Sequence, residues 1–141
     1  MKLFRKLFPT KETRAYRKMH RRHRRELIKL AKKDAEWDWE FLHTLVMAKV
    51  RHMYEYYEAG NNVWRLKTVA ELKHVLDLQE ELDNVFNGMP RPIIKVNDDG
   101  SVTFTCNEED DKRADEMFKR EDELYKEIYC YIAEYLRGWW D

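Results

Sequence analysis

Residues 35–57 read AEWDWEFLHTLVMAKVRHMYEYY, and this stretch decides the fold class because it contains neither glycine nor proline. Its apolar residues recur every three or four positions, which predicts an amphipathic helix. Further rings at Trp37 and Phe41, together with Leu45, widen the apolar stripe, so we expect burial against more than one neighbour and most of the rings in the core. The stripe itself comprises Ala35, Trp39, Leu42, Val46, Val50, Met53 and Tyr57.

The preceding segment, residues 10–33 (TKETRAYRKMHRRHRRELIKLAKK), predicts a helix with two different faces. One face is suited to docking. It carries Tyr16, Met19, His23, Leu27 and Leu30. Another face is basic, and it extends over about 27 Å at ~1.5 Å per residue. It carries Arg14, Lys18, Arg21, Arg25, Lys29 and Lys32.

Charge is divided sharply along a chain whose formal net charge is zero. Residues 1–33 contain fourteen Lys or Arg against Glu12 and Glu26, whereas residues 34–141 contain 25 acidic and 13 basic residues. Such asymmetry concerns partners more than fold. We therefore expect a basic N-terminal helix or arm at 1–33 and an acidic helical domain at 34–141.

Two further helices and a β-hairpin are expected beyond residue 60. Helical periodicity continues from about residue 63 to 86 and again from Asn107, where the acids of NEEDD suit a helix start. Between them, residues 92–106 predict two short strands, 93–96 and 102–105, around an Asp-Asp-Gly turn. The predicted fold class is mainly α, an antiparallel helical bundle of about four helices with a small β-hairpin insert.

Motifs for catalysis or metal binding find little support. His20 and His23 are one helical turn apart, but the neighbouring arginines would repel a zinc ion. The NDDGS stretch fails as a calcium loop because Lys95 and Cys106 occupy ligand positions. The acidic pairs Glu108/Glu109 and Asp110/Asp111 are typical of a solvated helix start. We expect no enzyme, catalytic residue, metal or cofactor.

The basic helix is the strongest functional signal. Its arginines and lysines could bind the phosphate groups of a nucleic acid or nucleotide, or an acidic host protein. The same sequence would also suit a basic face that is only solvated, or one that is neutralised by the chain's own acidic body or by a second copy. The predicted phosphate or acidic-partner residues are Arg14, Arg17, Lys18, Arg21, Arg22, Arg24, Arg25 and Lys29. Trp37, Trp139 and Trp140 are predicted to stack or form an interface, with core packing as the alternative for the terminal pair.

The expected location is the cytoplasm of a host cell, without a membrane partner. No apolar run approaches the ~20 residues that cross a bilayer. MKLFRKLFP lacks the continuous apolar stretch of a signal peptide. Cys106 and Cys130 have no CxxC spacing, so we expect reduced thiols.

Three motifs occur together in this chain: a Trp-Asp-aromatic box that opens a long helix (WDWEFLHTLVMAKVRHMYEYY), a second helix with ELKHVLDLQEEL, and an end of the form YLRGWWD. In these motifs the chain resembles a diffuse group of small uncharacterised proteins of bacteriophages and prophages. The resemblance covers roughly residues 36–141. It implies a phage context and no particular activity.

Within that context, we expect a non-enzymatic accessory protein that counters a host defence by stoichiometric binding. Its basic helix would bind a nucleic-acid-binding effector or a nucleotide signal, with homo-oligomerisation as a further expectation. The alternatives are a virion or genome-packaging protein that binds nucleic acid and, third, a metal-dependent enzyme.

Overall fold

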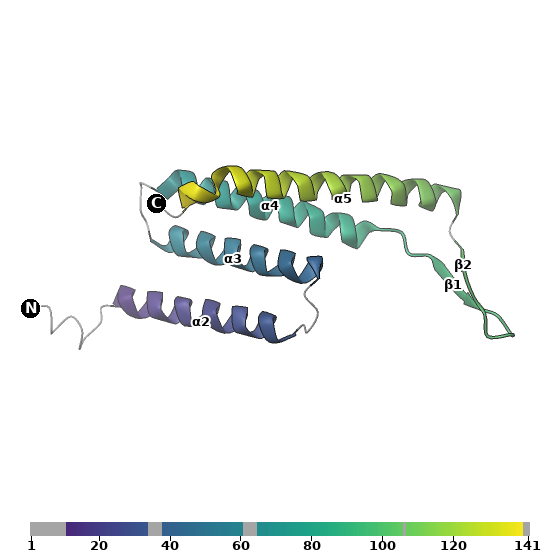
Figure 1. The fold of residues 1–141 in the computed structure, drawn as a ribbon, viewed down its shortest axis with the longest axis horizontal. Coiled ribbons are helices and arrows are strands. Elements are labelled where there is room, and N and C mark those ends of the chain that lie inside the picture. Colours follow the sequence, from purple (N-terminus) through teal and green to yellow (C-terminus); the bar gives the residue numbers. More distant parts are fainter. Residues whose placement is uncertain (1–10, 34–37, 61–64, 106, 140–141) are drawn as a thin grey trace, which may run out of the picture. The chain divides into compact units, whose positions relative to one another are not determined.

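The computed structural model describes residues 11–33, 38–60, 65–105 and 107–139 (Figure 1). The chain divides into two compact units, residues 1–56 and 57–141. The basic helix therefore shares a unit with most of the following helix, whereas the sequence predicted a division between residues 33 and 34.

The first unit contains α2 (Lys11–Lys33) and α3 (Trp39–Ala59), which run antiparallel (Figure 1). Asp38 caps the start of α3, because its carboxylate accepts a hydrogen bond from the backbone N–H of Phe41 at 2.8 Å. A side-chain acceptor at this position satisfies one of the amides that a helix start leaves unpaired.

Helix α3 contains several buried residues. The prediction that most of its rings form the core is wrong: Phe41 is buried, but Trp39 is 54% exposed and Tyr56 is 43% exposed. Smaller side chains such as Ala48 and Val50 are more enclosed than these rings. The buried residues of α3 are Phe41, His43, Met47, Ala48, Val50, His52 and Met53.

The second unit is built on α4 (Leu66–Gly88) and α5 (Glu108–Tyr135), with the short 3-10 helix η2 (Leu136–Trp139) completing the chain's described part. Antiparallel packing brings Arg120 of α5 to Glu81 of α4, with a nitrogen–oxygen distance of 2.6 Å. Helix α5 buries Leu124, Ile128 and Ile132. The fully enclosed residues of this core are Leu72, Val75, Leu82, Leu124, Ile128 and Trp139.

A β-hairpin separates α4 from α5 at the predicted residues. Strands β1 (Ile93–Val96) and β2 (Val102–Thr105) pair antiparallel, with Val96 opposite Val102. Gly100 closes the turn with a φ of +81°, a conformation that glycine adopts without strain. Asn107 then caps α5, its side-chain oxygen accepting the N–H of Asp110 at 2.7 Å.

The structure confirms the predicted fold class: the described residues form four α-helices, paired antiparallel, and a small two-stranded hairpin. None of the described helices has the length and apolarity needed to cross a bilayer.

Packing between α4 and α5 makes Leu82→Ala strongly destabilising. Leu82 has no exposed surface, so we expect a loss of about 2–5 kcal/mol in the free energy of unfolding. Leu66→Ala is the matched control, since Leu66 is 66% exposed and its truncation should cost less than about 0.5 kcal/mol. Urea unfolding followed by circular dichroism measures both values; equal losses would contradict the described core.

Candidate functional site

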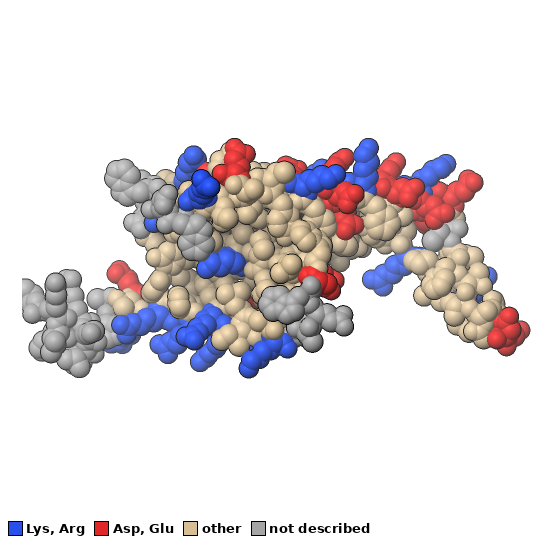
Figure 2. Space-filling view, viewed as in Figure 1, with Lys and Arg blue, Asp and Glu red and all other residues tan. Residues whose placement is uncertain are grey.

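Helix α2 presents its cations to solvent. The docking face predicted from its periodicity is partly buried at Met19, His23, Leu27 and Leu30. Tyr16 of the same face packs against Tyr56, with ring centroids 5.4 Å apart. We call the exposed set the cationic face, and Lys and Arg side chains line α2 in Figure 2. The cationic face comprises Arg14, Arg17, Lys18, Arg21, Arg22, Arg24, Arg25 and Lys29.

Two reciprocal histidine–carboxylate contacts hold α2 against α3. His23 of α2 donates to Glu55 of α3 at 2.7 Å, and His52 of α3 donates to Glu26 of α2 at 2.9 Å. Between these contacts the two imidazole rings stack, with centroids 3.9 Å apart and planes 5° from parallel. We call these four residues the His–Glu quartet.

Arginines flank the His–Glu quartet on both helices. Arg22 forms an ion pair with Glu55, and Arg51 lies 3.6 Å from the carboxylate of Glu26. Each carboxylate therefore faces one imidazole and one guanidinium, an arrangement that compensates its charge. Glu26 is engaged with α3 in this way, so an acid within the basic helix contributes less to neutralising the cationic face.

The pKa values in the quartet respond to burial and to partners. Burial lowers the pKa of His52 and the charge of His23 lowers it further, although the hydrogen bond to Glu26 opposes both effects. Burial acts to raise the pKa of Glu55, but the hydrogen bond from His23 and the charge of Arg22 outweigh it, so that pKa lies below its ordinary value. The quartet therefore favours a neutral His52 beside an ionised Glu55.

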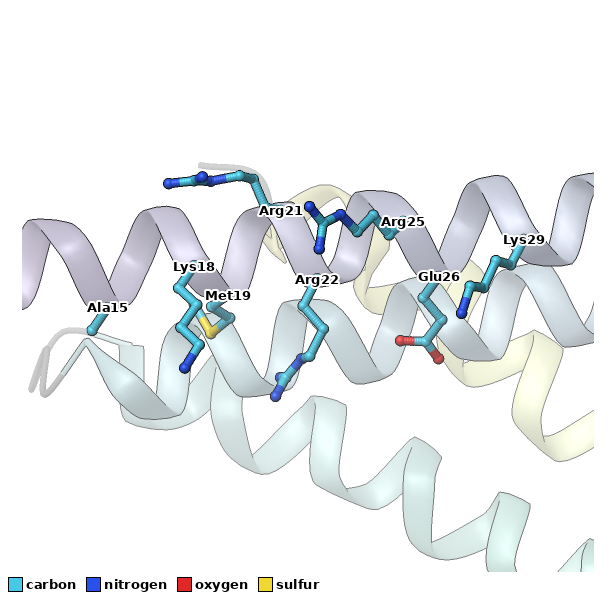
Figure 3. Close-up of a pocket in the computed structure, with 8 residues that line it drawn as sticks. All are labelled: Ala15, Lys18, Met19, Arg21, Arg22, Arg25, Glu26 and Lys29. Atoms are coloured by element: carbon cyan, nitrogen blue, oxygen red, sulfur yellow. The ribbon is translucent and has the colours of Figure 1, made fainter.

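An open hollow of about 880 Å³ lies along α2 (Figure 3). Lys18, Arg22 and Lys29 contribute charged heads to its lining, and Met19 supplies an apolar surface. Figure 3 shows Arg21 and Arg25 on a different side of the helix from Lys18 and Arg22, so the charge wraps around α2 rather than forming one narrow row. Such a surface suits an extended anion better than a small enclosed ligand.

A second, smaller hollow of about 260 Å³ lies along the first half of α2, and Arg21 lines both hollows. Tyr16 and His20 line it with rings, and Arg17 and Arg21 line it with cations. Arg21 is oriented by a hydrogen bond from its Nε to the backbone oxygen of Arg17, at 3.3 Å. Ring and guanidinium groups are thus grouped on the exposed surface of one helix.

The histidines of the HRRH stretch have separate environments. His23 belongs to the quartet, whereas His20 is exposed and lies 6.2 Å from the ring of Tyr16 between centroids. Among the described residues, no three His, Cys, Asp or Glu side chains group so as to hold a metal ion.

Of the three tryptophans predicted to stack or form an interface, Trp37 and Trp140 lie outside the described residues. Trp139 is a correction: it has no exposed surface, and its Nε1 donates to Glu71 at 2.9 Å. The hydroxyl of Tyr57 also donates to the backbone oxygen of Trp139, at 2.5 Å. A ring enclosed and hydrogen-bonded on these sides is a core residue, because it has no free face for a ligand.

Sequence reasoning missed His52, Glu26 and Glu55 as site residues. One available signal was a repeated spacing: His23 precedes Glu26 by three residues in α2, and His52 precedes Glu55 by three in α3. Residues three apart share a helix face, so antiparallel helices can pair two such motifs reciprocally. The sequence did not reveal which helices are adjacent.

No protein-family model matches the chain, and searches of curated proteins and of solved structures gave no match. The resemblance to phage proteins therefore stays a prediction from short motifs.

Replacing Trp139 with phenylalanine should lower the free energy of unfolding by about 1–3 kcal/mol, because the buried carboxylate of Glu71 loses its indole donor. Trp39→Phe is the control, since Trp39 is more than half exposed and should lose less than about 0.5 kcal/mol. Urea unfolding distinguishes the two variants. A Trp139→Phe protein as stable as the wild type would show that this hydrogen bond does not stabilise the fold.

Acidification should weaken the α2–α3 pair. The folded pKa of His52 lies below its ordinary value of 6.5, so the unfolded chain binds more protons than the folded chain. The contribution of His52 to stability is therefore fully present above about pH 6.5 and declines as pH falls below that value. The contribution of Glu55 is present above about pH 4.5 and is lost as pH falls through the lower folded pKa. Thermal unfolding followed by circular dichroism at stepped pH should show both declines.

The variant His52→Gln removes the first titration, so its melting temperature should fall less than that of the wild type as pH decreases from about 6.5. Exposed His20→Gln should keep the wild-type pH dependence. If both variants behave like the wild type, His52 does not couple protonation to stability.

Proposed function

We propose that this protein acts by stoichiometric binding rather than catalysis, and that its cationic face contacts the phosphate backbone of a nucleic acid. The supporting observation is that all eight residues of the cationic face are exposed along one helix. Helix α2 as a whole carries eleven Lys or Arg against two Glu. Neutralising backbone phosphates with such a surface releases counterions and drives binding without base contacts.

The form of the surface favours an extended anion. Its cations follow α2 over several turns, and the larger hollow is open and lined mainly by Lys and Arg. Guanidinium groups at Arg21, Arg24 and Arg25 are suited to paired contacts with phosphate oxygens. We therefore expect affinity for nucleic acid with little sequence preference.

The proposed setting is the cytoplasm of a phage-infected host, where the protein counters a defence system. A cationic face can compete for the nucleic acid of a defence effector, or occupy an acidic surface of the effector itself. The same chemistry would serve the alternative role of holding genome in a virion. Pull-down from infected cells with and without nuclease separates a nucleic-acid-bridged complex from a direct protein contact.

A second candidate ligand is a nucleotide signal, which the smaller hollow favours. Tyr16 and His20 offer rings for a base, while Arg17 and Arg21 offer charge for its phosphates. Calorimetric titration with a panel of nucleotides tests this candidate, because a specific nucleotide should bind more tightly than inorganic phosphate.

The triple variant Arg21→Glu, Arg24→Glu, Arg25→Glu should weaken binding to a fluorescent duplex oligonucleotide by more than about tenfold. Wild-type affinity should fall with rising salt, with a log–log slope steeper than about −3, and the variant should have a shallower slope. Fluorescence anisotropy at stepped salt concentrations measures both quantities.

The control is Lys112→Glu, Lys119→Glu, Lys126→Glu, which changes net charge equally at exposed positions of α5. It should keep most of the affinity, because the removed cations lie outside the cationic face. Equal losses of affinity in the two triple variants would show that binding depends only on net charge, and would contradict the proposal.

A further inference from the structure

The β-hairpin exposes an apolar surface. Side chains alternate between the two faces of a strand, so the register places Ile94, Val96, Val102 and Phe104 together on one face. Their exposed fractions are 60%, 73%, 49% and 66%, respectively. A two-stranded hairpin alone is marginally stable in water, and a contiguous exposed apolar patch commonly marks an interaction surface.

The outer edge of β2 has backbone groups directed away from β1. Asn97 donates its N–H to the oxygen of Ser101 at 2.9 Å, which identifies these residues as a hydrogen-bonded pair. Because such pairs alternate along an antiparallel ladder, Val96 and Val102 form a non-hydrogen-bonded pair. Their amides point outward, from β1 and from β2 respectively.

The two outer edges differ in their protection against a further strand. Pro92 precedes β1 and Lys95 lies within it, and both residue types hinder strand addition. Strand β2, with the sequence VTFT, has neither proline nor charge. A partner strand therefore meets fewer obstacles at β2.

Acidic residues flank β2 at both ends of its sequence. Asp98 and Asp99 precede it in the turn, and Glu108 and Glu109 follow it in the first turn of α5. A matching partner therefore has apolar residues at alternate positions and cations beyond both ends. A second copy of β2 would instead bring the same acids towards one another, which disfavours self-pairing.

We propose that β2 binds an extended protein segment with alternating apolar residues and Lys or Arg at its ends, which pairs with the outer edge as a third strand. Backbone hydrogen bonds supply affinity in this mode of recognition, and side chains beside Val102 and Phe104 supply selectivity. This surface consists of other residues than the cationic face. Its partner carries cations, whereas the partner of the cationic face is an anion.

The test uses the full chain and a fluorescein-labelled peptide of alternating valine and threonine flanked by lysine pairs. Fluorescence anisotropy should show saturable binding, and a peptide flanked by glutamate pairs should bind at least about tenfold more weakly. A lack of binding by the lysine-flanked peptide, or equal binding of both peptides, would overturn the proposal. Sedimentation measures whether the chain associates with itself. Self-association that blocks peptide binding would also overturn the proposal.

Two matched proline variants locate the edge. Val102→Pro removes an outward amide of β2 and should weaken the lysine-flanked peptide by about tenfold, whereas Val96→Pro removes the corresponding amide of β1 and should leave binding unchanged. Amide NMR spectra establish that the hairpin persists in both variants. Equal effects of the two prolines would overturn the assignment to β2.

A charge-swap variant provides a test without proline. Asp98→Lys with Glu109→Lys leaves one acid and one lysine at each end of β2, so it should remove the preference, and the two peptides should bind with similar affinity. Retention of the wild-type preference would show that these acids do not select the partner. Nucleic-acid binding through α2 is measured separately, so failure here leaves the proposed function intact.

Discussion

The reciprocal pairing of His23 with Glu55 and of His52 with Glu26 is the interaction on which the orientation of the cationic face depends. A helix bearing so many cations has few apolar side chains to fix its rotation. Two directional contacts on one side of α2, with stacked imidazoles between them, supply that constraint. They fix the rotation of α2 and therefore the direction of its cationic face.

The quartet also explains why an acid within the basic helix is compatible with phosphate binding. Glu26 accepts a hydrogen bond from His52 and lies near Arg51, so its charge is balanced by α3. Glu26 lines the larger hollow and its side chain is 39% exposed, so these contacts with α3 compensate a negative charge that an approaching phosphate would meet. Thus the contact that holds α2 in place also favours the proposed binding of phosphate.

Much of the fold could be predicted because its signals are local. Periodicity identified the four helices, and the Asp-Asp-Gly turn located both strands. The aromatic residues of α3 were harder, since Trp39 and Phe41 look equally apolar in sequence yet differ in exposure. Which face a ring occupies depends on neighbours distant in sequence, and periodicity does not identify them.

By itself, the sequence determined the helices, the hairpin and the concentration of cations in residues 11–33, because propensity, turn chemistry and charge act over a few residues. Only the tertiary structure decided that His52 and Glu55 complete a cluster with α2, that Trp139 is enclosed beside Glu71, and that the hairpin's apolar face is exposed. The physical reason is the same in each case: burial and charge compensation belong to pairs of segments brought together by folding, and no single segment encodes its partner.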